Sequence, residues 1–199
     1  MQDVTNATEK GTRSTPGRRM STSHRVTPPR RARPPPPAVR FGDLSGAAGS
    51  PTVTLGMGTF GRVRLVRHKH TGQHYALKCL KKQAMVEMDQ VEHTLSEVKC
   101  LRELRHPFIV SLVTTFNDPA RVHMLMELVQ GGELYGVCQS LGKFKEPLTT
   151  WYAAQVVVML DVMHSRGYCY RDLKPENLLM CAGGKGGAGD GYLKLWCVC

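Results

Sequence analysis

Alternating apolar and polar positions predict strands early in the folded part of the chain. Around residues 62–65 arginines alternate with valine and leucine, which is the period of a half-buried strand. A second strand is predicted at 74–80, directly after a threonine–glycine turn. Residues 88–104 predict a helix, because apolar residues recur there at spacings of three and four: Val91, Leu95, Val98, Leu101 and Leu104.

The second half of the chain begins with a predicted hairpin and continues with helices. Residues 108–116 and 122–129 are rich in β-branched and large apolar side chains, and an Asn-Asp-Pro turn separates them. Beyond a glycine pair, the pattern predicts a short helix near 133–141 and a long one near 148–165, bounded by Gly167. Strands followed by helices favour an α+β fold rather than repeated βαβ units.

The first fifty residues differ from the rest in composition. Of the 12 prolines, seven lie in 16–37, and residues 1–50 contain nine Lys or Arg against three Asp or Glu. So little apolar surface cannot offset the entropy of ordering the chain, which predicts a disordered, basic tail over 1–50. Two narrower readings stay open: polyproline docking through the prolines at 34–37, and binding to nucleic acid or acidic lipid. No aromatic residue precedes Phe41, so no nucleic-acid partner is expected.

Charge and cysteine content exclude several classes of protein. The net charge is +11, and no stretch approaches the roughly 18 consecutive apolar residues that a membrane helix needs. The N-terminus lacks the apolar region of a secretory signal and begins Met-Gln, which is not a myristoylation signal. The seven cysteines are scattered without a Cys-x-x-Cys pair, so neither a disulfide framework nor a zinc knuckle is expected. These features predict a cytoplasmic protein without a transmembrane segment.

A glycine-rich stretch is the first candidate for chemistry. The stretch spans 55–63, and the residues at its end and beyond alternate as a strand does, whereas the residues after a dinucleotide-binding loop form a helix. No Gly-Lys-Ser/Thr follows, so the stretch is not a Walker loop. A glycine loop between two strands can fold over a nucleotide and offer backbone N–H groups to its phosphates; the alternative is a simple hairpin turn. The stretch comprises Leu55, Gly56, Met57, Gly58, Thr59, Phe60, Gly61, Arg62 and Val63.

A lysine on the next predicted strand strengthens the nucleotide interpretation. Lys78 follows Gly61 by 17 residues, and its neighbours on the same strand face, Ala76 and Leu80, are apolar. A lysine in such a place needs an anionic partner, which Glu97 on the following helix can supply while phosphates supply the ligand.

The most specific signal is Tyr-Arg-Asp-Leu-Lys-Pro-Glu-Asn-Leu-Leu at 170–179. With it, residues 55–199 resemble a eukaryotic protein kinase that carries Tyr170 in place of the usual histidine. The segments 92–97 and 131–134 resemble those of the AGC group of kinases, nearest the cyclic-AMP-dependent and then the cyclic-GMP-dependent kinases. The resemblance implies a bilobal fold with a small, β-rich lobe and hinge at 51–129. It also implies an incomplete helical large lobe at 130–199.

The resemblance implies a role for each matching residue. Asp172 would orient the substrate hydroxyl, Lys174 would neutralise the transferred phosphoryl group and Asn177 would hold Mg²⁺. The implied substrates are ATP and basic Ser/Thr peptides, and the implied partner is a cyclic-nucleotide-binding regulatory subunit. Glu133 and Glu176 match positions that read arginines in the peptide. The remaining implied nucleotide contacts are the glycine loop, Ala76, Lys78, Glu97, Met126, Glu127, Val129 and Leu179.

The chain departs from the family at the metal-binding Asp-Phe-Gly motif. Cys197 stands at the aspartate position, and a thiol is a poor ligand for Mg²⁺. The sequence then stops before the activation segment, so we expect a truncated and inactive chain. A nucleotide-binding pseudokinase that acts by protein contacts is the alternative, and a prenylated Cys-x-Cys end is a weaker one. The tail also holds Ser21 in an Arg-Arg-x-Ser context that such kinases phosphorylate.

Overall fold

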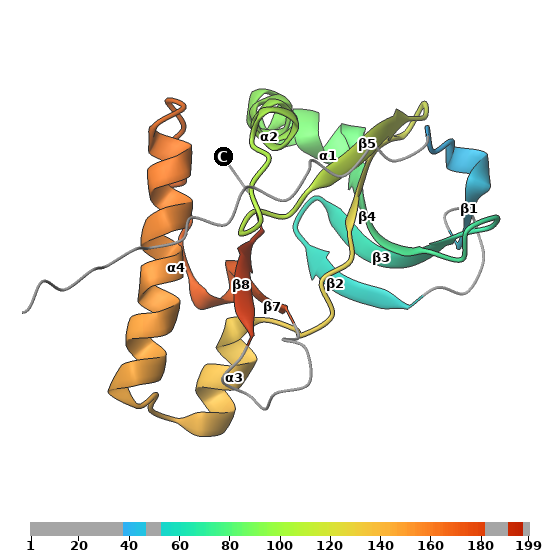
Figure 1. Cartoon of the computed structure of the whole chain (residues 1–199). Helices are drawn as coiled ribbons and strands as arrows, with labels where there is room; N and C mark the ends of the chain where they lie inside the picture. The colour runs from blue at the N-terminus through green and yellow to red at the C-terminus, as the bar shows by residue number, and fades with distance from the viewer. Residues whose placement is uncertain (1–37, 47–52, 182–190, 197–199) are drawn as a thin grey trace, which may run out of the picture. The chain divides into compact units, whose positions relative to one another are not determined.

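The small lobe is built on a six-stranded antiparallel sheet. Our computed structural model describes residues 38–46, 53–181 and 191–196, all within the compact unit Pro36–Cys199. The sheet order is β1-β3-β4-β6-β5, and β2 also pairs with β3 (Figure 1). The strands are β1 Leu44–Ser45, β2 Thr54–Gly58, β3 Gly61–His68, β4 His74–Lys81, β5 Leu112–Asn117 and β6 Arg121–Glu127.

The central strand β4 is buried on both faces. Ala76 and Leu80 on one face and Leu77 and Cys79 on the other are all buried, which explains its almost continuous apolar sequence. Its register places Lys78 between Val63 of β3 and Met124 of β6. The predicted strands at 62–65 and 74–80 and the predicted hairpin are therefore confirmed.

Two helices lie between β4 and β5, and only the second falls within the helix that the sequence predicted over 88–104. They are α1 Lys82–Glu87 and α2 Val91–Glu103, and the break between them contains Asp89 at φ 51°. The predicted apolar face of this helix is partly wrong, because Leu95 is 64% exposed. The buried residues of α2 are instead Thr94, Glu97, Cys100 and Leu101. The face that packs inward includes Glu97, which meets a cation on β4.

The described part of the large lobe begins after the hinge and contains two α-helices, a one-turn helix and a hairpin. The helices are α3 Leu134–Leu141 and α4 Glu146–His164, close to their predicted bounds. Pro147 lies in the first turn of α4, where a proline costs no hydrogen bond. The one-turn helix η2 Pro175–Asn177 leads into the antiparallel pair β7 Leu178–Cys181 and β8 Tyr192–Leu195.

Residues 38–46 belong to the folded unit, although the composition assigned them to the tail. They form η1 Phe41–Asp43 and β1, and β1 pairs with Arg67 and His68 of β3. Val39 and Leu44 are buried in a cluster on the sheet with Leu77, Leu125 and others. The predicted domain boundary at residue 50 is therefore too late. The buried Val39 and Leu44, with the partly buried Phe41 packed against the same cluster, anchor this short segment beside a proline-rich stretch.

The larger hydrophobic core joins the sheet to the large lobe. It contains Leu101 of α2, Met124 of β6, Met159 of α4 and Leu193 of β8 among its fully buried members. In the described ranges, no helix is long and apolar enough to cross a membrane. Cys79, Cys138, Cys169 and Cys181 are free thiols, whereas Cys100 is disulfide-bonded, which the scattered cysteines did not predict.

Candidate functional site

One cavity brings together almost all of the predicted site residues. Its volume is about 1080 Å³, and residues 55–63 line one side of it. Every predicted site residue lines it except Met126 and Glu127. Those that line it from outside the loop are Ala76, Lys78, Glu97, Val129, Glu133, Asp172, Lys174, Glu176, Asn177 and Leu179.

The glycine loop spans the end of β2, the turn at 59–60 and the start of β3, and its glycines have different roles. A β-carbon on Gly61 would lie 1.8 Å from the carbonyl oxygen of Cys79, so the packing of β3 on β4 itself requires a glycine there. A β-carbon on Gly56 or Gly58 would meet no protein atom within 4 Å. Both of these glycines line the cavity, so they leave the backbone open to close approach by a ligand.

A buried ion pair stands at the cavity wall beneath this loop. Lys78 Nζ lies 2.7 Å and 2.9 Å from the two carboxylate oxygens of Glu97. The side chains are 16% and 6% exposed, so water screens the pair little. Glu97 fixes the ammonium at the cavity, where two of its three N–H groups are bonded and further donor capacity faces the space.

The opposite wall carries a hydrogen-bonded acid. Lys174 Nζ donates to Asp172 Oδ1 at 2.9 Å, and Asn177 Nδ2 donates to Asp172 Oδ2 at 2.8 Å. The bond from Lys174 is the main cause that lowers the pKa of Asp172; partial burial opposes it and the Asn177 bond adds to it. Asp172 is therefore a carboxylate at neutral pH. Because the side-chain nitrogen of Asn177 is directed to Asp172, its side-chain oxygen is left to coordinate a hard cation.

The loop that carries this acid is fastened to the end of β8. Tyr170 is buried, and its hydroxyl donates to the carbonyl oxygen of Trp196 at 2.6 Å. The Trp196 N–H donates in turn to the carbonyl of Asn177 at 2.8 Å. Arg171 has a φ of 49°, a left-handed conformation that is strained for a residue other than glycine and clusters at functional sites.

Two predicted residues do not line the cavity, and several unpredicted ones do. Met126 is fully buried in the core, and the Glu127 carboxylate bonds to Ser111 N–H and Lys194. Residues that line the cavity without having been singled out include Gln90, His93, Thr94, Leu128, Gln130 and Trp196. Leu128 and Gln130 could have been found because they flank Val129 in the chain. His93 and Thr94 could have been found because they precede Glu97 at helical spacing and so share its face of α2.

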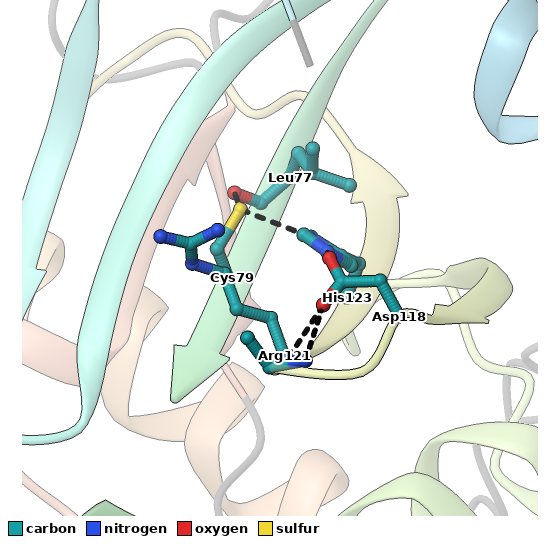
Figure 2. Close-up of polar contacts among 6 residues, drawn as sticks. Leu77, Cys79, Asp118, Arg121 and His123 are labelled. Carbon is teal, nitrogen blue, oxygen red and sulfur yellow. Dashed lines mark hydrogen bonds and ion pairs between the residues drawn. The ribbon is translucent and has the colours of Figure 1, made fainter. Parts of the chain in front are cut away.

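A second cluster of reactive residue types lies on the small-lobe sheet. Figure 2 shows the His123 ring between Cys79 and Asp118, and the distances are 3.3 Å from Nδ1 to Sγ and 2.7 Å from Nε2 to Oδ2. The order is that of a nucleophilic triad, but burial raises the pKa of the Cys79 thiol. The cluster lies outside the cavity lining and packs beneath Phe41. It is a satisfied polar network that runs from the buried Cys79 and His123 to the partly exposed Asp118.

The hydrogen bond from His123 is the first cause that lowers the pKa of Asp118, to about 2. A carboxylate only accepts, so Nε2–H is the donor to Asp118. The Cys79 thiol donates to the Leu77 carbonyl, and its sulfur lies beside Nδ1 of the ring. Backbone N–H groups of Ala120 and Arg121 complete the set on Asp118 at 2.8 Å and 2.7 Å. The network therefore stabilises the β5–β6 turn.

Comparison with known proteins agrees with this geometry. The protein kinase domain family matches residues 50–195. The chain is 47% identical over 127 residues to the cAMP-dependent protein kinase catalytic subunit of Arthrobotrys oligospora, covering 64% of this chain and 24% of that protein. It is 46% identical over 127 residues to cAMP-dependent protein kinase type 3 of Saccharomyces cerevisiae, covering 64% and 32%.

A cyclic-GMP-dependent relative is equally similar. The identity to mouse cGMP-dependent protein kinase 2 is 46% over 142 residues, covering 71% of this chain and 18% of that protein. The chain thus spans about a third or less of the length of these relatives. Because the family match extends from the first strand of the cavity to the end of β8, this chain belongs to the protein kinase family.

Proposed function

We propose that this chain binds ATP in the cavity and derives from a serine/threonine kinase that phosphorylates basic peptides. The observation that carries the proposal is the buried Lys78–Glu97 pair, which holds a cation between an open glycine loop and the Asp172 carboxylate. A triphosphate suits this arrangement, because backbone N–H groups and an ammonium are its usual protein ligands. Val129 and Leu179 line the same cavity and supply an apolar place for adenine.

In the phosphoryl transfer of the active kinase from which we propose that this chain derives, the acid and the lysine of the large lobe have separate tasks. Asp172, held as a carboxylate, accepts a hydrogen bond from the substrate hydroxyl and aligns it for attack on the γ-phosphorus. The bond from phosphorus to the β,γ-bridging oxygen breaks as the new one forms, and the hydroxyl proton leaves to Asp172. Lys174, whose side chain is 47% exposed beside Asp172, neutralises charge on the moving phosphoryl group.

Two exposed carboxylates support the choice of a basic peptide. Glu133 and Glu176 both line the cavity, and both are exposed, so each can pair with an arginine of the substrate. We further propose a cyclic-nucleotide-binding regulatory partner, by analogy with relatives named cAMP-dependent and cGMP-dependent kinases. A cytoplasmic location stays a prediction. Ser21 lies outside the described residues, so its modification is also a prediction.

The donor set for magnesium is the weak part of the site. Asn177 offers one amide oxygen, and Cys197, outside the described residues, offers a thiol where the family has a carboxylate. Among the described residues no group of three His, Cys, Asp or Glu is arranged to hold a metal ion. Hard cations favour oxygen, so these residues do not fit a tightly held Mg²⁺. We therefore propose that this sequence binds nucleotide without efficient phosphoryl transfer, and the alternative pseudokinase role rests on the same observation.

Calorimetric titration of ATP, with and without Mg²⁺, tests nucleotide binding, and incubation of the chain with ATP, Mg²⁺ and a peptide tests phosphoryl transfer. The chain should bind ATP, gain little affinity from the metal, and leave a peptide that contains Arg-Arg-x-Ser unphosphorylated. Lys78→Met should weaken ATP binding about tenfold or more, as expected for a lost charged hydrogen bond. Cys197→Asp should add a metal-dependent gain in affinity.

The possible failures are distinct. A chain that takes up no ATP would overturn the nucleotide site. Peptide phosphorylation that disappears in Asp172→Asn would leave the site in place and refute the proposed inactivity.

A further inference from the structure

A buried lysine on β8 is bonded to the glutamate that begins the hinge. Lys194 is 7% exposed, and its Nζ donates to Oε1 of Glu127, the last residue of β6. The lysine side chain is 9% exposed and the glutamate side chain 32%. An ammonium buried to this degree needs a carboxylate partner. Within the described ranges, Glu127 is the carboxylate in ion-pair distance of Lys194.

Glu127 is also held by the backbone of Ser111, the residue before β5. Its Oε1 accepts the Ser111 N–H at 2.8 Å, and its own N–H donates to the Ser111 carbonyl at 3.0 Å. The adjoining Val110 N–H donates to the carbonyl of Leu195 at 3.0 Å. Glu127 is thus fixed from two directions, by the small lobe through Ser111 and by β8 through Lys194.

The far end of the hinge is fastened to the same hairpin. The Gly131 N–H donates to the carbonyl of Met180 at 2.9 Å, and the Met180 N–H donates to the carbonyl of Gly132 at 2.8 Å. A β-carbon on Gly131 would lie 2.2 Å from that Met180 oxygen, so the approach is close. The three residues between the two fastenings, 128–130, all line the cavity.

The hairpin also contributes to the lining of the cavity. Leu179 of β7 pairs in register with Lys194 of β8, and Leu179 lines the cavity. Figure 1 shows β7 and β8 beside the chain that leaves β6. One short hairpin therefore carries Leu179, which lines the cavity, and Lys194, which secures the hinge.

We propose that Lys194 is a positioning residue that, through Glu127, sets the spacing between the hinge backbone and Leu179 and thereby the affinity for the adenine base. This inference rests on the proposed ATP site and adds to it a determinant outside the cavity lining. In the register of β4 with β6, Glu127 is opposite Tyr75, three positions along β4 from Lys78, so the pair lies toward the hinge rather than beside the ammonium. It should therefore affect the base and leave the phosphate contacts unchanged.

The test compares Lys194→Met in the full 199-residue chain with the unchanged chain, using three probes: ATP, adenosine and inorganic triphosphate. Lys194→Met should weaken ATP and adenosine by the same factor, roughly two- to thirtyfold, the usual range for residues that act through a neighbour. Triphosphate affinity should stay within about twofold, because distant sites behave independently. Lys78→Met should give the reverse pattern, and Lys143→Met on the surface should change neither.

A second variant separates positioning from loss of folding. Glu127→Gln retains an acceptor for Ser111 N–H but removes the charge, and the double variant with Lys194→Met should be no weaker for adenosine than Lys194→Met alone. A general loss of folding would reduce triphosphate binding as well. Equal adenosine affinity in Lys194→Met and the unchanged chain would overturn this inference and leave the proposed ATP site in place. Parallel losses of affinity for adenosine and triphosphate in Lys194→Met would do the same. An unchanged chain that binds no ATP would overturn the proposed function and this inference together.

Discussion

Replacing Gly61 by alanine should destabilise the small lobe, whereas the same change at Gly58 should not. The new β-carbon at Gly61 would lie 1.8 Å from the Cys79 carbonyl oxygen and 3.1 Å from the Leu80 α-carbon. Both neighbours are backbone atoms of β4, so neither can move aside as a flexible side chain would. Strands β3 and β4 must separate at this end to admit the methyl group.

The magnitude follows from the overlap. Ordinary contacts to a β-carbon begin at 3.4 Å, so the methyl group is too close by about 1.6 Å, an overlap of the kind that costs about 1–3 kcal/mol in a packed site. Separation also endangers the bond from Lys81 N–H to the Phe60 carbonyl, which is 2.9 Å long and contributes about 0.5–1.5 kcal/mol. The free energy of unfolding should therefore fall by about 2–4 kcal/mol, a large part of a typical total.

Thermal unfolding followed by circular dichroism measures this difference. Gly61→Ala should melt roughly 5–15 °C below the unchanged chain. Gly58→Ala should equal it or gain up to about 1 kcal/mol, because alanine lowers the entropy of the unfolded chain. It should nevertheless bind ATP more weakly, since its methyl group occupies space above the cavity. Equal melting temperatures for the two variants would refute the reasoning.

Three further predictions concern single side chains. Asp118 has its pKa lowered to about 2 from 3.8, so its contribution is present above about pH 4 and is lost as the pH falls toward 2; in urea titrations across this range, Asp118→Asn should have a shallower loss of stability. Glu97→Gln leaves a buried ammonium without its counter-ion and should cost about 2–4 kcal/mol in chemical denaturation, whereas Glu92→Gln, exposed on the same helix, should change stability by less than about 0.5 kcal/mol; similar losses in the two would contradict a buried ion pair. Tyr170→Phe removes the donor to the Trp196 carbonyl and should lower stability by about 1 kcal/mol, a value that a melting curve unchanged from the parent would exclude.

The residues that touch the proposed nucleotide could be found in the sequence because they lie in short, contiguous segments. The glycine loop and the 170–179 stretch each occupy consecutive positions, and the cavity brings these segments together. The partner of Lys78 was also predictable, since a cation between apolar neighbours on a strand requires an anion and Glu97 lies on the next helix. Its orientation was less so: the apolar periodicity of α2 favoured Leu95, yet the ion pair turns Glu97 inward and leaves Leu95 exposed.

By itself, the sequence determined the chemistry of this protein: which donors and acids are available, their order along the chain, and the cysteine where a magnesium ligand is expected. Only the tertiary structure decided how these groups are held. The Lys194–Glu127 pair joins residues 67 positions apart, and the glycine at 61 is required by the backbone of another strand. Such contacts depend on strand register and on packing between segments distant in the chain, and no local pattern encodes them.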